Sequence, residues 1–182
     1  VKKEAQRSGL KLFNTGLLPG IGFGAEITGM SPHRVAMLQR RQRQVSLGSS
    51  SGPRPALVRE VFPMRNPVVF LLAPLTRYHT EWYRGVVGHD ASCLEPPMLV
   101  KFFEQARVAL SRGTGSWMQA SAEGQTGLAI WAVSHLNWEW ISANEIHTTV
   151  GTVSLLKVAP TALRNLALKE LQLRDNAQAV FK

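Results

Sequence analysis

The chain has 182 residues, of which 45% are hydrophobic and 18% are charged, a composition typical of a globular protein with a buried core. The single cysteine, Cys93, excludes an internal disulfide framework and fits a reducing compartment. No apolar run approaches the ~18 residues of a membrane-spanning helix, so the sequence predicts no membrane span.

The formal net charge of +9 is unevenly distributed along the chain. Residues 1–65 contain eleven Lys and Arg against three Glu, whereas residues 66–182 contain ten basic residues against nine acidic ones. A basic N-terminal third predicts a polyanionic partner, most often nucleic acid. The alternative is a basic surface that is solvated or that binds an acidic protein.

The first elements in chain order are two helices. Residues 1–13 predict a helix with a basic face, followed by a turn or cap at 14–16. Residues 17–28 are apolar and rich in small side chains, which favours a close-packed helix with Pro19 in its first turn. Gly29 suits the end of that helix. The basic face consists of Lys2, Lys3, Arg7 and Lys11.

The segment 31–48 predicts the clearest helix of the chain. Ser31 is a favourable N-cap and Pro32 a favourable first helical residue. An inward stripe follows at helical spacing, and arginines cover the rest of the surface. The stripe consists of Val35, Leu38, Gln42 and Val45; the arginines are Arg34, Arg40, Arg41 and Arg43. The composition of residues 46–55 is typical of a flexible linker.

Four further helices and a hairpin are expected in the C-terminal part. The helices span 66–85, with a kink at Pro74, 96–112, 126–136 and 160–181. The residues of the helix 96–112 that are expected to face inward are Leu99, Phe102, Phe103, Ala106 and Leu110. β-Branched residues around a turn at 150–152 predict a hairpin within 145–157. The expected fold class is therefore mainly α, with a helical N-terminal part (1–48), a linker (49–65) and a helical part with a small β-hairpin (66–182).

The stretch GIGFGA, residues 20–25, formally matches the loose dinucleotide fingerprint through Gly20, Gly22 and Ala25. A phosphate-binding loop follows a buried strand, and the segment before this stretch contains Gly16 and Pro19, which disfavour a strand. Close helix packing explains the glycines better, and Glu26 is expected to pair with an arginine such as Arg34. A nucleotide-dependent enzyme that uses this stretch remains an alternative.

Residues for catalysis or metal binding are scarce. Asp occurs only at Asp90 and Asp175 and there is no adjacent acidic pair, so a two-metal phosphoryl-transfer site is hard to assemble. His89 and Cys93 have the spacing of half a zinc site but lack a second pair of ligands. We therefore predict no catalytic residue, no metal and no cofactor. Trp138 and Trp140 could stack on bases, although core packing is the simpler expectation.

One stretch, residues 11–48, resembles the start of the thumb in non-LTR (LINE-type) retroelement reverse transcriptases. The resemblance covers about a fifth of the chain. Phe23 departs from the tyrosine usual in that family. The matching residues are Leu18 and Pro19, then Phe23, Gly24, Ala25 and Glu26, then the run from Leu38 to Arg43, and finally Leu47 and Gly48. Residues 66–83 and 135–164 resemble, more loosely, the connector that follows the thumb.

The resemblance implies a non-catalytic piece of an RNA-directed DNA polymerase, because the aromatic-x-Asp-Asp motif of the palm is absent from this chain. It implies RNA or an RNA–DNA hybrid as a partner, the palm domain of the same polyprotein as a second partner, and an intracellular ribonucleoprotein in nucleus or cytoplasm. The expected phosphate contacts are Arg34, Arg40, Arg41 and Arg43, supported by Lys2, Lys3, Arg7 and Lys11. The alternatives are a basic interaction or structural domain and a degenerate element remnant without activity.

Overall fold

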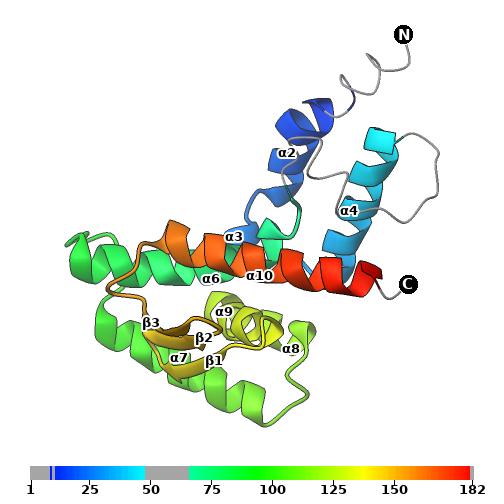
Figure 1. The fold of residues 1–182 in the computed structure, drawn as a ribbon. Helices are drawn as coiled ribbons and strands as arrows, with labels where there is room; N and C mark the ends of the chain where they lie inside the picture. Colours follow the sequence, from blue (N-terminus) through cyan, green and yellow to red (C-terminus); the bar gives the residue numbers. More distant parts are fainter. Residues whose placement is uncertain (1–8, 10, 48–65, 181–182) are drawn as a thin grey trace.

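The computed structural model describes residues 9, 11–47 and 66–180. The fold is mainly α with one small antiparallel sheet, as the sequence predicts (Figure 1). The predicted linker at 49–65 lies outside the described residues. The helical elements are η1 (Phe13–Leu17), α2 (Leu18–Gly22), α3 (Ala25–Thr28), α4 (Pro32–Leu47), α6 (Val69–Trp82), η2 (Tyr83–Val87), α7 (Pro96–Ser111), α8 (Trp117–Ala122), α9 (Gly124–His135) and α10 (Pro160–Val180).

The helices from α6 onward form a layered body around the sheet, and η1 to α4 project from it as an arm (Figure 1). Helix α6 packs against α9, α3 and α10, and α9 packs against α7 and α8. The sheet has the order β1 (Glu139–Ser142), β2 (Glu145–Thr148), β3 (Gly151–Ser154). The predicted hairpin is thus confirmed as β2–β3, but its turn lies at residues 149–150 and not at 150–152, since Gly151 and Thr152 pair with Thr148 and His147. Strand β1 adds a third strand through an irregular antiparallel pairing with β2.

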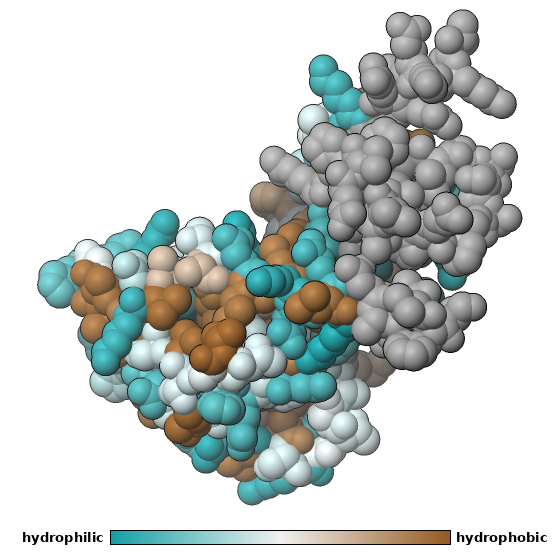
Figure 2. Space-filling view, viewed as in Figure 1, coloured by the Kyte–Doolittle hydropathy of each residue, from teal (hydrophilic) through white to brown (hydrophobic). Residues whose placement is uncertain are grey.

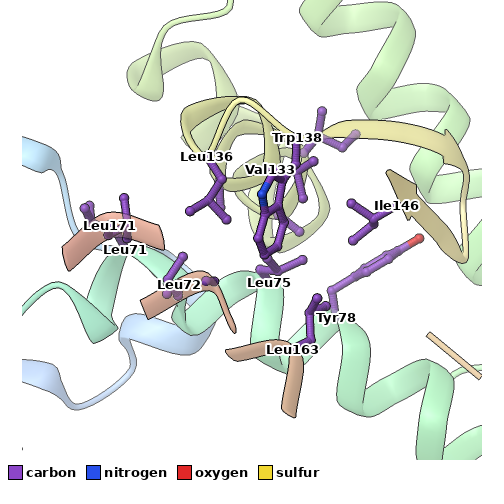
Figure 3. Packing of buried hydrophobic residues seen from close by; sticks show 14 of the residues in the cluster. Leu71, Leu72, Leu75, Tyr78, Val133, Leu136, Trp138, Ile146, Leu163 and Leu171 are labelled. Carbon is purple, nitrogen blue, oxygen red and sulfur yellow. The ribbon is translucent and has the colours of Figure 1, made fainter. Parts of the chain in front are cut away.

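One hydrophobic core holds the layers together. Figure 3 shows that leucines of α6 lie near Val133 of α9, near Leu136 just after it, and near Leu163 and Leu171 of α10. Tyr78, also on α6, donates a hydrogen bond from its hydroxyl to the Ala143 carbonyl at 2.9 Å, which ties α6 to the β1–β2 turn. Burial of such side chains contributes about 1.5–3 kcal/mol each, so this core is the main source of the stability of the fold.

Trp138, just before β1, and Trp140, on β1, pack against the core. Trp138 is buried, and the Trp140 ring lies 5.1 Å from Phe103 and 5.6 Å from Tyr78, both centroid to centroid in edge-to-face contact. The interpretation as a core residue is therefore confirmed for Trp138, and Trp140 is partly buried against the same core.

Several boundaries differ from the sequence prediction. Residues 14–16 form no turn, because the chain remains helical through the wide turn η1, where the Thr15 hydroxyl donates to the Lys11 carbonyl at 2.8 Å. The predicted helix 17–28 is broken at Phe23 and Gly24, where Gly24 adopts a left-handed φ of 76° that glycine tolerates best. Helix α8 was not predicted, although Ser116 caps it by accepting the Gln119 N–H.

Pro74 lies inside α6, and the helix continues through it. Leu99, Phe103 and Ala106 of α7 are buried as predicted. Phe102, which was also expected to point inward, is 37% exposed. The error has a simple cause, since residues one apart on a helix lie about 100° apart and only one of two adjacent phenylalanines can face the core.

Close contact between α8 and α9 depends on Gly127. A Cβ added there would lie 2.5 Å from the Ala120 carbonyl oxygen and 2.6 Å from the Glu123 Cβ. Gly127→Ala is therefore expected to lower the free energy of unfolding by about 1–3 kcal/mol, measured by urea denaturation. Gly20→Ala in α2 is the matched control: nothing lies within 4 Å of the new methyl group. Equal loss of stability in both variants would contradict this account of the α8–α9 packing.

Candidate nucleic-acid interface

The predicted basic helix is α4, and its local structure follows the sequence closely. The Arg34 N–H donates to the Ser31 hydroxyl oxygen at 3.3 Å, which confirms Ser31 as the N-terminal cap. Val35, Leu38 and Gln42 are buried on one side of the helix. The Gln42 side-chain amide donates to the Asn14 side-chain carbonyl oxygen at 3.4 Å, so the helix that contains η1 lies beside α4.

The remaining surface of α4 carries exposed arginines. Arg34, Arg40 and Arg41 are exposed, and none of the three forms an ion pair with an acidic residue in the described part of the chain. Arg34 and Arg41 are seven residues apart, so they lie on one side of the helix at a separation of about 10.5 Å along its axis. Arg41 donates to the Gln44 side-chain oxygen at 3.2 Å, a contact that leaves its charge uncompensated.

Of the other predicted phosphate-binding residues, only Lys11 has a described side chain. Lys11 is exposed on the neighbouring helix. Lys2, Lys3 and Arg7 lie outside the described residues, and Arg43 lies within α4 without a described side chain. Four of the predicted residues, namely Lys11, Arg34, Arg40 and Arg41, are thus exposed on two adjacent helices of the arm.

A second cationic region was not predicted from the sequence. It is a pocket of about 700 Å³ between the turn that joins α2 to α3 and the surface of α6 and α10. Arginines from three elements line it: Arg77 of α6, Arg84 of η2 and Arg164 of α10. No sequence pattern joins these residues, because the third is 80 positions from the second.

The glycine-rich stretch borders this pocket but forms no phosphate loop. Gly20 and Gly22 belong to α2, and Phe23 and Gly24 form the turn to α3, so no strand precedes the glycines. A Cβ at Gly22 would overlap the Phe70 ring, and a Cβ at Gly29 would meet the Leu128 side chain at 2.8 Å. Close packing on α6 and α9 therefore explains these two glycines, whereas Gly20 and Gly24 have open space around them.

Glu26 also differs from expectation. It is exposed, it lines the pocket, and it forms no ion pair with Arg34 or with another residue that the structure describes. The acid that pairs with an arginine nearby is Glu81, whose Oε1 lies 2.5 Å from the Arg77 Nη2. Glu81 also accepts the Leu94 N–H at 3.3 Å and is almost completely buried.

Few other described side chains are suited to metal binding or to nucleophilic catalysis. Within residues 9, 11–47 and 66–180, no group of three His, Cys, Asp or Glu residues could hold a metal ion. Burial raises the pKa of the Cys93 thiol, with smaller contributions from Glu81 and Asp90, which favours the unreactive protonated form. A hydroxyl and an N–H of Ser92 hold the pKa of Asp90 below its usual value, and Arg84 contributes less.

None of the described helices is both long enough and apolar enough to span a membrane. The face of the body seen in Figure 2 mixes hydrophilic and hydrophobic residues and shows no continuous apolar belt. Comparison of the chain with protein-family models, with curated proteins and with solved structures finds no match.

Proposed function

We propose that this chain is a non-catalytic, sequence-independent nucleic-acid-binding segment that contacts the phosphates of an RNA–DNA duplex through α4. The observation that carries the proposal is the set of three exposed arginines on α4, Arg34, Arg40 and Arg41, none of them neutralised by a carboxylate among the described residues. The buried side of the same helix fixes it to the arm, so its cationic surface has one orientation. Contacts of this kind give affinity without sequence readout.

The resemblance of residues 11–48 to the thumb of LINE-type reverse transcriptases extends this proposal. In that setting the arm would lie against the template–primer duplex within an intracellular ribonucleoprotein, and the palm domain of the same polyprotein would carry the catalysis. The apolar side chains exposed along the arm, which include Leu12, Leu17 and Ile21, support a partner of that kind because water-exposed aliphatic clusters are typical of interaction sites.

The salt dependence of binding tests the role of α4. Each lost phosphate contact should reduce the slope of log K against log of salt concentration by about 0.7–0.9. For Arg40→Ala/Arg41→Ala we therefore expect a slope shallower by about 1.4–1.8, measured by filter binding to an RNA–DNA hybrid.

The matched control is Lys101→Ala/Arg112→Ala, which removes two exposed positive charges from α7 and its C-terminal cap, on the side of the body away from the arm (Figure 1). The control should retain the slope of the unmodified protein. An unchanged slope in the α4 variant, or an equal change in both variants, would exclude α4 as the phosphate-binding surface.

A further inference from the structure

The pocket beside the glycine-rich turn is formed by two parts of the fold that are distant in sequence. One wall is the α2–α3 turn with Phe23, Glu26 and Ile27; the other is a surface of α6, η2 and α10. Its volume of about 700 Å³ falls in the range of ligand-binding clefts. The α2–α3 wall is positioned by the left-handed Gly24 and by the contact of Gly22 with Phe70.

The charge of the pocket selects an anionic occupant. The side chains of Arg84 and Arg164 form no hydrogen bond or ion pair with any described residue, although the charge of Arg84 also acts on Asp90, while Arg77 is engaged with Glu81. Glu26 is the one acidic residue among the lining residues that the structure describes. The hydroxyls of Thr76 and Thr80 donate to carbonyls of their own helix, at 3.0 and 2.8 Å, so the arginines supply the donors.

The apolar part of the pocket selects the kind of anion. Phe23 is 93% exposed and Ile27 is 59% exposed at its mouth, and Val69 and Phe70 are half-buried along its wall. Exposed aromatic and aliphatic side chains beside arginines are typical of the central contacts of protein interfaces. A phosphate group can pair with the arginines but cannot pack against the aliphatic side chains. A peptide that carries both carboxylates and an apolar side chain can make both kinds of contact.

We propose that this pocket binds an acidic segment of a partner protein. An aromatic or aliphatic side chain of that segment packs against Phe23, Ile27 and Phe70, and flanking carboxylates pair with Arg84 and Arg164. Glu26 opposes the approach of the acidic segment and limits its affinity. This site is separate from α4, so it adds protein recognition to the proposed nucleic-acid binding and does not depend on it.

Fluorescence anisotropy with short labelled probes tests the proposal. The probes are an acidic peptide with a central Leu-Phe pair, the same peptide with Ser-Gly in place of that pair, and single-stranded oligo(dT). The Leu-Phe peptide should bind more tightly than the other two. Phe23→Ala and Arg84→Ala/Arg164→Ala should each weaken its binding at least about 5-fold, since truncation of central interface residues typically has effects of this size.

Two further variants test the opposing charge of Glu26 and provide a control outside the pocket. Glu26→Gln should tighten binding of the Leu-Phe peptide, because it removes the opposing charge, and Arg112→Ala, which lies outside the pocket, should change nothing. All the substituted side chains are exposed, so unchanged thermal melting verifies that each variant is folded. The RNA–DNA hybrid should still bind the pocket variants, which separates this test from that of α4.

Three outcomes would overturn the proposal. Equal binding of the Leu-Phe and Ser-Gly peptides would show that no apolar anchor is recognised. Loss of oligo(dT) binding in the pocket variants, without binding of the Leu-Phe peptide, would assign the pocket to nucleic acid. Retention of peptide binding by both Phe23→Ala and Arg84→Ala/Arg164→Ala would place the peptide elsewhere on the protein.

Discussion

Phe103→Ala is expected to lower the free energy of unfolding by about 3–5 kcal/mol, the usual cost of truncating a fully buried aromatic side chain. Phe103 is 0% exposed and lies where three parts of the body meet. Its ring is 6.5 Å from that of Tyr78 on α6 and 5.1 Å from that of Trp140 on β1, centroid to centroid. The cavity left by alanine would therefore separate α7 from both the sheet and α6.

The neighbouring Phe102→Ala provides the control. Phe102 is on the same helix but 37% exposed, so its loss should cost about 1 kcal/mol. Urea denaturation of both variants measures the difference, with equal m-values as the sign that the unfolded states are comparable. Similar destabilisation by the two substitutions would show that α7 does not pack through the Phe103 side as described.

The helices that the sequence predicts best are those with a local signal at each end. Helix α4 has its Ser31 cap and its apolar stripe within one short segment, and α7 begins at Pro96 with inward residues at helical spacing. The same holds for the β2–β3 hairpin, where β-branched residues flank a two-residue turn. Such features depend on neighbours in sequence, so they can be predicted without the fold.

The elements that were wrong or missed depend on contacts distant in sequence. Residues 14–16 look like a turn, yet the side chain of Asn14 receives a hydrogen bond from Gln42 and the helix continues through η1. Helix α8 has only six residues and is covered by α9, a packing that requires Gly127. Tertiary contacts decide between helix and turn in such short segments.

The same distinction applies to the candidate site. The arginines of α4 were predictable because they lie within ten positions of one another on one helix. The arginines of the pocket were not, because Arg77, Arg84 and Arg164 come from α6, η2 and α10 and meet only through packing. The interpretation of the glycines in residues 20–25 as packing positions holds for Gly22, which contacts Phe70, but not for Gly20 and Gly24, which have open space around them. The exposure of Phe23 was not predicted.

His79 anchors the segment that leads from β3 into α10 onto α6, and it provides the second strong prediction. The ring is completely buried, and its Nε2 lies 3.0 Å from the Leu155 carbonyl oxygen and 2.8 Å from that of Val158. Both partners are acceptors, so Nε2 carries the proton and donates. His79→Leu would leave both carbonyls without this donor, and we expect the free energy of unfolding to fall by about 2–4 kcal/mol at neutral pH.

His79 should also make the stability of the protein depend on pH. Burial lowers its pKa below the ordinary value of 6.5, with the two carbonyl hydrogen bonds acting in the opposite direction, and Nδ1 is buried without a partner among the described residues. The folded state therefore binds fewer protons than the unfolded state once the pH falls below about 6.5. The free energy of unfolding should decrease towards acid by up to about 1.4 kcal/mol per pH unit for this group.

His135 contributes in the same direction, because burial, and to a lesser extent the charge of Arg174, lowers its pKa. Urea denaturation at pH about 7 and about 5 should thus show a loss of stability in the unmodified protein that is smaller in His79→Leu and intermediate in His135→Gln. The ranking follows from burial, since His79 is fully enclosed while His135 is exposed on one side and stacks on Trp131 with ring centroids 4.8 Å apart. An acid-induced loss of equal size in His79→Leu and the unmodified protein would mean that His79 is not the buried neutral donor that joins α6 to α10.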